Sequence, residues 1–165
     1  MFKDNLKIIN FIVDWLNNYC DKNSVEGFVI GVSGGIDSAL TSTLCSMTTR
    51  PVLCVQMPIH QSTNEIIRST NHIKWLEEKF KNVNSIEDNL SSIYDEFTKN
   101  KVNFTDSKSN FNEKQQLALA NTRSRLRMLN LYFHATSNNY IVVGTGNKVE
   151  DFGVGFYTKY GDGGV

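Results

Sequence analysis

Residues 28–38, FVIGVSGGIDS, decide the fold. The first part, residues 28–32, is a short apolar run of the size of a buried strand. Ser33 and a pair of glycines follow, and Asp37 and Ser38 then open a segment that is expected to be helical. A buried strand that turns through glycines straight into a helix is typical of a parallel α/β sheet. In such sheets ligands bind beyond the carboxyl ends of the strands, where this turn lies.

The alternation of strand and helix continues along the chain. Apolar runs predict strands at residues 28–32, 52–57, 83–86 and 140–143, and apolar residues at helical spacing predict helices at 1–16, 38–47, 64–80, 89–98 and 113–136. The polar stretch 100–112 is predicted to be a surface loop. Because the strands are almost continuously apolar, we expect a doubly wound parallel sheet with helices on both faces.

Composition excludes several classes of protein. The 165 residues are 40% apolar, and 17 basic residues balance 17 acidic ones. Tight nucleic-acid binders usually carry a basic excess, so we expect no nucleic-acid partner. No stretch approaches the apolar length of a membrane span, and the N-terminus lacks the apolar core of a signal peptide. The odd number of cysteines lacks metal-ligand spacing, which favours a cytoplasmic protein with reduced thiols.

The turn after the first predicted strand suits a phosphate group. Gly34 and Gly35 allow the backbone to approach an anion closely, and the N–H groups and dipole of the helix start favour negative charge. Asp37 would repel phosphate unless a cation stood between them, so it suggests Mg²⁺. The turn is not a Walker A loop, which ends in Gly-Lys-Ser/Thr, and its glycine spacing differs from the dinucleotide fingerprint.

The C-terminal stretch 140–165, YIVVGTGNKVEDFGVGFYTKYGDGGV, repeats the order of strand, glycine turn and charged helix start. Glu150 falls just beyond the end of its strand, as Asp37 does beyond its own. If the strands are neighbours, the carboxylates of Asp37 and Glu150 converge on one cation. A single carboxylate at a turn is usually a helix cap or solvated, but a matched pair favours a metal site.

Other polar residues leave alternatives open. Asn121 and Arg125 share one helix face, whereas Arg123 and Arg127 form a separate pair that is at least as well explained as solvated or structural cations. His60 is either a surface-loop residue or part of a nucleotide pocket. We interpret the remaining histidines as structural and the cysteines in apolar runs as core residues; these residues are His72, His134, Cys45 and Cys54.

Several motifs resemble a known family. SGGIDS resembles the pyrophosphate-binding loop of the N-type ATP pyrophosphatases, which cleave ATP between its α- and β-phosphates. GTGNKVE, GFYTKYGDGG, NTRSRLRM and MPI are similar to the corresponding pieces of bacterial NAD synthetases. These pieces run from Gly31 to the C-terminus, and TKYGDGG is the most specific of them. The resemblance implies an adenine nucleotide α-hydrolase-like fold.

The resemblance also implies roles for matching positions. Asp37 and Glu150 would bind Mg²⁺, and no catalytic side chain is assigned. The residues expected to contact ATP are Gly31, Val32, Ser33, Gly34, Gly35, Ile36, Asp37, Ser38 and Thr145. The residues expected to contact deamido-NAD are Asn121, Arg125, Lys159 and Asp162. The segment QMPIHQ, residues 56–61, departs from the pattern, because it lacks the arginine that some members place before the proline.

The implied activity is the ATP-dependent amidation of deamido-NAD to NAD, with release of AMP and pyrophosphate. Ammonia is the expected nitrogen donor, since the chain reaches its phosphate loop by Gly31 without a preceding glutaminase domain. The alternatives are another pyrophosphatase of this group, such as a GMP synthetase, and a non-catalytic adenine-nucleotide-binding module. A homodimer is expected through the helix at 113–136, whose apolar residues include Leu126, Leu129, Tyr132 and Phe133.

The chain is expected to be a single domain, residues 1–165, that is truncated on its C-terminal side. It stops at residues 161–165, GDGGV, inside the most family-specific motif, and glycines anchor a chain end poorly. We therefore expect an exposed sheet edge or an open cleft where further chain would pack, and no turnover by these residues alone.

Overall fold

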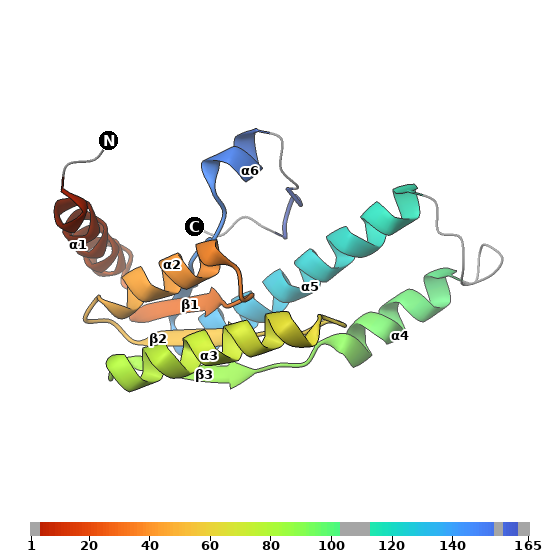
Figure 1. The fold of residues 1–165 in the computed structure, drawn as a ribbon, viewed down its shortest axis with the longest axis horizontal. Helices are drawn as coiled ribbons and strands as arrows, with labels where there is room; N and C mark the ends of the chain where they lie inside the picture. The colour runs from red at the N-terminus through yellow and green to blue at the C-terminus, as the bar shows by residue number, and fades with distance from the viewer. Residues whose placement is uncertain (1–3, 103–112, 154–156, 162–165) are drawn as a thin grey trace.

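The structure, a computed structural model, describes residues 4–102, 113–153 and 157–161, apart from the side chains of residues 100–102 and 150. The predicted strands and helices follow one another in the expected order, with two helices in succession before the last strand (Figure 1). The strands are β1 (Gly27–Gly31), β2 (Val52–Gln56), β3 (Val83–Glu87) and β4 (Tyr140–Val142). The helices are α1 (Asn5–Asn23), α2 (Ile36–Ser46), α3 (Thr63–Lys79), α4 (Ser91–Val102), α5 (Glu113–Asn138) and α6 (Lys148–Phe152).

The four strands form one parallel sheet in the order β3-β2-β1-β4. β1 lies between β2 and β4, with Val29 opposite Leu53 on one side and Val142 on the other. Parallel strands point the same way, so their carboxyl ends lie at one edge of the sheet. The predicted neighbourhood of the strands that precede the two glycine turns is therefore confirmed.

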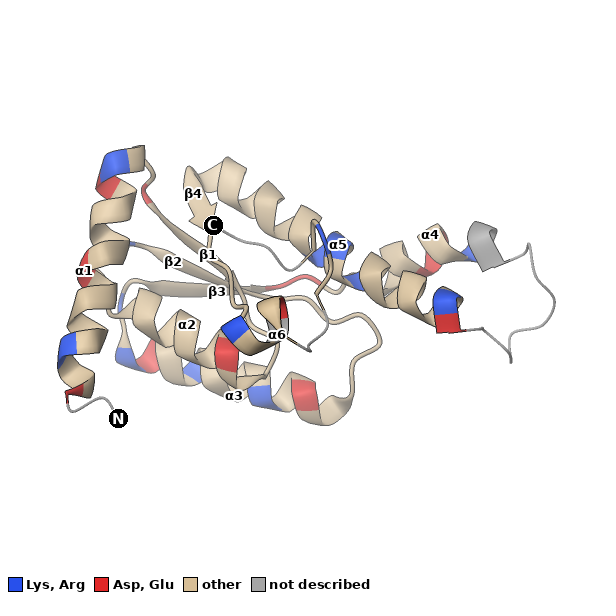
Figure 2. Cartoon of the chain, turned by 90° about the horizontal axis from the view of Figure 1, so that it is seen from above, with Lys and Arg blue, Asp and Glu red and all other residues tan. Residues whose placement is uncertain are grey.

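Helices cover both faces of the sheet, which confirms the predicted doubly wound α/β class. α2 and α3 pack on one face with α1 beside α2, and α5 packs on the opposite face across β1 and β4 (Figures 1 and 2). Each face has its own core. Phe28 and Ile30 of β1 belong to the core under α1, α2 and α3, while Val29 belongs to the core under α5. This division follows from the alternation of side chains along a strand.

Three helices extend beyond their predicted ends, of which α5 does so only slightly, to Asn138 instead of residue 136. α1 continues to Asn23, because Leu16 and Cys20 bury one turn apart against the first core before Ser24 ends the helix in a left-handed conformation. The predicted loop at residues 100–112 is wrong at its start, since α4 continues through Val102. Residues 100–102, Asn-Lys-Val, include neither glycine nor proline, so no helix breaker ends α4 before Val102. The rest of that predicted loop lies outside the described residues.

α2 begins earlier than predicted, so the glycine loop that precedes it is shorter than expected. The helix starts at Ile36, with Gly35 as its N-cap residue, so Asp37 lies in the first helical turn. A helix start leaves its opening N–H groups without partners inside the helix. The loop between β1 and α2 therefore presents backbone donors at the same sheet edge to which β4 leads.

Candidate functional site

Serine side chains shape the loop between β1 and α2. Ser38 is buried, and its Oγ accepts a hydrogen bond from the Ser33 N–H at 3.2 Å and donates one to the Gly35 carbonyl at 3.1 Å. The Gly35 N–H donates to Ser33 Oγ at 3.2 Å. These bonds fold the loop back onto the start of α2, so the loop is shaped by its own side chains.

Gly34 packs the same loop against α3. Its φ is +86°, in the region that side chains other than glycine rarely adopt. A Cβ atom at this position would lie 2.6 Å from the Glu65 carbonyl oxygen. Arg68 of α3 also reaches the loop, since its Nε donates to the Gly34 carbonyl at 3.1 Å. These contacts with α3 therefore fix the position of the glycine loop relative to the sheet.

The second loop runs from β4 to α6 and touches the first loop. Asn147 donates from Nδ2 to Oδ2 of Asp37 at 3.3 Å, and its Oδ1 accepts the Val149 N–H at 3.0 Å. One side chain therefore begins α6 and also holds the carboxylate of Asp37. Asp151 lies one turn further on, with its carboxylate packed against Gly146. The turns that follow β1 and β4 thus meet through side chains.

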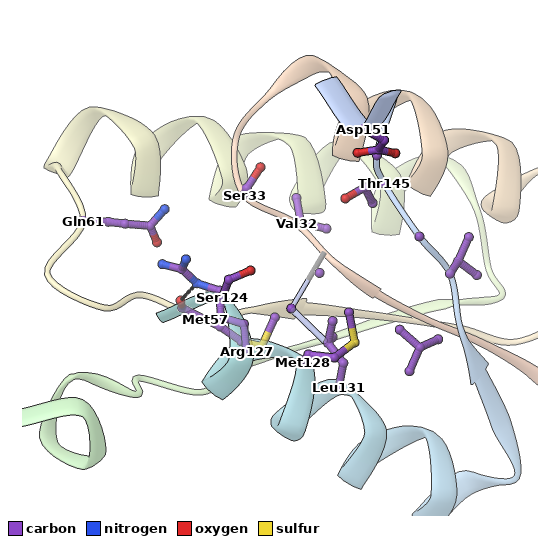
Figure 3. Close-up of a pocket in the computed structure, with 16 residues that line it drawn as sticks. Val32, Ser33, Met57, Gln61, Ser124, Arg127, Met128, Leu131, Thr145 and Asp151 are labelled. Atoms are coloured by element: carbon purple, nitrogen blue, oxygen red, sulfur yellow. Dashed lines mark hydrogen bonds between the residues drawn. The ribbon is translucent and has the colours of Figure 1, made fainter. Parts of the chain in front are cut away.

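A cavity of about 260 Å³ opens where these loops and α5 meet (Figure 3). Its wall includes Ser33 from the first loop, Thr145 from the second, and Ser124, Arg127 and Leu131 from α5. The full lining is Gly31, Val32, Ser33, Met57, Gln61, Ser124, Arg127, Met128, Leu131, Val142, Val143, Gly144, Thr145, Gly146, Asp151 and Gly161. An apolar floor with a polar rim of hydroxyls, backbone and one guanidinium suits a small polar ligand.

The predicted ATP contacts divide between two sides of the first loop. Gly31, Val32, Ser33 and Thr145 line the cavity just described. Gly34, Gly35 and Ile36 line a second hollow of about 290 Å³ behind the loop, which Arg68 and His72 also line and which shares Val32 with the first. Asp37 and Ser38 line neither hollow, although both contact residues of the two loops.

The predicted substrate residues gather on one side of α5. Thr158 Oγ1 donates to Asn121 Oδ1 at 2.8 Å, and Arg125 Nε donates to the Lys159 carbonyl at 3.1 Å. Asn121 and Arg125 therefore share one helix face, as predicted, and that face carries the segment 157–161. Asp162 lies outside the described residues. The backbone of Glu150 lies in α6, and its side chain is outside what the structure describes.

Sequence reasoning missed polar residues that line the cavity. Arg127 donates from Nε to the Met57 carbonyl at 3.1 Å and lies over the end of β2 (Figure 3). The sequence leaves Arg127 open as a solvated or structurally paired cation, and its bond to Met57 is such a pairing, in a place that also lines the cavity. Arg123 of the same pair stacks on Tyr94 with 4.9 Å between guanidinium carbon and ring centroid. Asp151 and Gln61 also line the cavity. Its position beside Met128, which faces the core, is the sequence feature that indicates a partly buried Arg127.

The three histidines are not among the residues that line the cavity beside α5, although His72 lines the second hollow. His60 is exposed and its Nε2 lies 2.7 Å from Asp95 Oδ1, which supports the surface-loop interpretation. His72 lies 2.9 Å from Ser42 Oγ, and His134 lies 2.6 Å from Asp88 Oδ2. Both are held by neighbours, as structural residues are.

The cysteines are free and buried in the core under α1, α2 and α3, as predicted for Cys45 and Cys54. Burial raises the pKa of the Cys54 thiol to about 12, and burial also raises the pKa of Cys45 and Cys20. A thiol with a raised pKa carries little thiolate at neutral pH, so these side chains act as small core residues.

Two wider features concern membranes and metals. Within the ranges that the structure describes, every helix is too short or too polar to cross a lipid bilayer. Within the same ranges, His, Cys, Asp and Glu side chains do not gather in groups of three or more that would hold a metal ion by themselves. Asp37 and Asp151 nevertheless bring carboxylates to the paired loops.

Comparison with known proteins decides the family. A family model described as NAD synthase matches residues 8–165. The chain belongs to the NAD synthase family. A relative from Methanosarcina acetivorans, named NH(3)-dependent NAD(+) synthetase, is 39% identical over 96% of this chain and 59% of its own length. One of the same name from Malacoplasma penetrans is 39% identical over 99% of this chain and 61% of its own length.

A solved structure agrees with the family's fold. The NMN synthetase from Francisella tularensis is 30% identical and superposes with a TM-score of 0.84, over 98% of this chain and 62% of that one. The fold is therefore that of the family, and the predicted adenine nucleotide α-hydrolase-like class is confirmed. The chain spans about three fifths of the length of the curated relatives just named.

Proposed function

We propose that the protein carrying this chain converts deamido-NAD to NAD with ATP and ammonia. The observation that carries the proposal is the meeting of the two glycine turns at the ends of β1 and β4, joined by the bond from Asn147 to Asp37, beside a cavity with Arg127 in its wall. Relatives at 39% identity are named NH(3)-dependent NAD(+) synthetase. The site and the relatives therefore favour the same chemistry.

The reaction has two balanced steps. In the first, a carboxylate oxygen of the nicotinate group attacks the α-phosphorus of ATP, and the bond to the departing pyrophosphate breaks. In the second, ammonia attacks the carbonyl carbon of the acyl-adenylate, loses a proton, and displaces AMP. Both reactants of the first step are anions, so charge neutralisation and alignment are the main tasks of the protein.

The residues of the two loops suit those tasks. Backbone N–H groups at the start of α2 and the hydroxyl of Ser33 would hold the pyrophosphate, and Thr145 would contact ATP from the second loop. Arg127, whose Nε is fixed on the Met57 carbonyl, brings a cation to the cavity wall and would offset developing phosphate charge. Arg125, Lys159 and Asp162 remain the proposed contacts of deamido-NAD.

Magnesium fits the acidic side chains here. Mg²⁺ usually takes one or two carboxylates and completes its shell with phosphate oxygens and water. We propose Asp37 and Glu150 as those carboxylates, with Asp151 nearby at the cavity. When bound, the ion would neutralise phosphate charge and orient the leaving group.

The test is a product assay on the full-length protein. With deamido-NAD, ATP, Mg²⁺ and ammonium, we expect NAD, AMP and pyrophosphate in equal amounts, and glutamine should not replace ammonium. Pyrophosphate release without deamido-NAD, or with another acceptor in its place, would favour a different ATP pyrophosphatase such as a GMP synthetase. Nucleotide binding without any turnover would favour the non-catalytic module.

A second candidate differs only in the acceptor. The close superposition with the Francisella protein, whose name makes it an NMN synthetase, favours a mononucleotide product as the alternative. The same two steps would then act on nicotinate mononucleotide. Comparing kcat/KM for the two acceptors at saturating ATP decides between them, because the preferred substrate has the larger value.

Two further proposals concern the setting of the enzyme. We propose a homodimer that uses the outer face of α5, where Leu129, Tyr132 and Phe133 are exposed. Leu126, the fourth residue of the predicted set, packs against the core under α5 instead. Free, buried thiols and the metabolic chemistry favour a cytoplasmic location.

A further inference from the structure

The segment 157–161, called the tail segment below, is seated on α5 by contacts along most of its length. Thr158 is 1% exposed, and its hydroxyl donates to Asn121 Oδ1 at 2.8 Å. The next residue, Lys159, accepts a hydrogen bond through its carbonyl from Arg125 Nε at 3.1 Å. The Gly161 N–H then closes a turn onto the Thr158 carbonyl at 2.9 Å. The buried Thr158 is therefore the anchor of the segment.

The tail segment forms part of the cavity wall. A Cβ atom at Gly161 would lie 2.6 Å from Ser124 Oγ, so the segment lies directly against α5. Gly161 and Ser124 both line the cavity, whereas Asn121 bonds to Thr158 and is not among the lining residues. Moving Thr158 off Asn121 would thus move Gly161 and deform the cavity without any contact between Asn121 and a ligand.

The geometry also fixes the direction of Lys159. Its neighbour Tyr160 has a φ of +67°, and the Lys159 ammonium lies 4.9 Å from the centroid of the Tyr160 ring. A lysine in such a turn is placed by the residues that anchor its backbone. Those residues are Thr158 before it and Gly161 after it, and Arg125 holds its carbonyl.

We propose that Asn121 is a positioning residue: it seats the tail segment through Thr158 and so sets the affinity for the dinucleotide without touching it. The inference rests on the proposed function and replaces the direct contact that the family resemblance implied for Asn121. Loss of the hydrogen bond between the buried Thr158 hydroxyl and Asn121 Oδ1 weakens the seated state. Because Asn121 and Thr158 act through one hydrogen bond, the effects of substituting them on KM should be coupled and not additive in free energy.

The experiment is a double-mutant cycle in the full-length protein with Asn121→Ala, Thr158→Val and the pair. We expect each single change to raise KM for deamido-NAD about tenfold, the size of one lost buried hydrogen bond, with KM for ATP changed less than about twofold. The double variant should also show about a tenfold rise. A product of the two effects, about a hundredfold, would mean independent contacts with the substrate and would overturn the proposal, as would unchanged KM in either single variant.

Matched controls separate this role from general damage to α5. Thr122 is the next residue along the helix, and its hydroxyl donates to the Ala118 carbonyl within α5 at 2.8 Å. Thr122→Val therefore removes the same group without touching the tail segment, and KM should stay at the wild-type value. Thr158→Ser keeps the hydroxyl and should restore most of the affinity. Failure of Thr158→Ser to recover KM would contradict the role of this bond.

A readout without catalysis distinguishes this inference from the proposed function. Hydrogen exchange of the peptide that contains residues 157–161 should be about tenfold faster in Asn121→Ala and in Thr158→Val than in the wild type. The double variant should exchange at the same rate as each single variant, and Thr122→Val should exchange at the wild-type rate. If the wild-type protein makes no NAD, the proposed function fails, and this exchange pattern still decides the seating role. Unchanged exchange in the single variants would overturn it.

Discussion

At the scale of single residues, Asp37 is the side chain that links the two loops. It lies in the first turn of α2, and Asn147 from the other loop donates to its Oδ2 at 3.3 Å. A carboxylate in that place is favoured by the helix dipole but would repel the phosphates of ATP. A divalent cation between them removes the conflict, which is why this side chain carries the metal proposal.

The first prediction is that Asp37→Asn lowers kcat/KM at least about a hundredfold while leaving the fold intact, because an amide keeps the shape but loses the charge that holds the ion. Glu150→Gln should act in the same direction. Raising Mg²⁺ should recover part of the activity. The control is Asp14→Asn on the exposed side of α1. Near-normal turnover of Asp37→Asn at the Mg²⁺ concentration used for the wild type would contradict the proposed metal role.

Gly34 shows how one residue fixes the loop. Its φ of +86° is a conformation that other residues rarely adopt, and a Cβ atom added here would lie 2.6 Å from the Glu65 carbonyl oxygen. Both features require glycine. Gly35, the next residue, has a φ of −90°, and the nearest atom to an added Cβ is Ser33 Oγ at 3.3 Å. The neighbouring glycines therefore differ in what they tolerate.

The second prediction compares alanine at these positions. Gly34→Ala should destabilise the protein by about 1–3 kcal/mol, because the substitution strains the backbone and pushes the loop from α3. Gly35→Ala should cost under about 0.5 kcal/mol, since only a side-chain oxygen must shift. Denaturant unfolding of both variants measures the difference. Equal stabilities would show that the loop does not rest on α3 as described.

At the scale of elements, α5 is tied to the end of β3 by hydrogen bonds as well as by apolar packing. Asp88 follows β3, and its Oδ2 lies 2.7 Å from Asn130 Nδ2 and 2.6 Å from His134 Nε2 of α5. Burial alone would raise the pKa of Asp88, but the hydrogen bonds from Asn130 and His134 and the charge of His134 outweigh it. The pKa of this carboxyl is therefore lowered.

The third prediction concerns acid. A carboxyl whose folded pKa is depressed stabilises the protein above its ordinary pKa of about 4, and that contribution is lost as the pH falls through the folded value. Asp88→Asn should therefore cost about 1–2 kcal/mol at pH 7 and remove part of the loss of stability below about pH 5. Unfolding by urea at several pH values measures both effects.

Asp95→Asn is the control for Asp88, because Asp95 is exposed and pairs with His60 at the surface. An exposed pair contributes little, so its loss should change stability by less than about 0.5 kcal/mol at pH 7. An acid profile of Asp88→Asn identical to that of the wild type would contradict the assigned role of Asp88.

At the scale of the whole molecule, α5 presents apolar side chains on both sides. Met128 and Leu131 bury against the sheet, while Leu129 and Phe133 are 69% and 65% exposed. Large apolar side chains in a row on a helix surface mark a contact site more often than isolated ones do. The dimer proposal rests on this outward row together with Tyr132.

The fourth prediction is that Leu129→Asp shifts the full-length protein from dimer to monomer, because a charge in an apolar interface must be desolvated. Sedimentation velocity at micromolar concentration measures the change. The control is Leu6→Asp on α1, which is also 69% exposed and should leave the dimer intact. Only monomer in the wild-type protein would count against the proposal.

Much of the fold could be predicted because its signals are local. The apolar runs of β1 and β2 and the glycine turn at residues 33–35 are read from neighbouring residues, and strand direction follows from the alternation with helices. Sequence also placed Asp37 and the second loop at one sheet edge, since parallel strands end together. The extension of α4 through Val102 escaped prediction, because polar composition alone does not distinguish an exposed helix from a loop.

The sequence by itself determined the α/β class, the glycine turn between β1 and α2, and the face shared by Asn121 and Arg125. Only the tertiary structure decided which arginine reaches the cavity. Residues one turn apart share a helix face whatever surrounds the helix, but the direction of that face depends on packing. Met128 and Leu131 bury under the sheet, and this turns Arg127 to the Met57 carbonyl and leaves Arg125 to hold the tail segment.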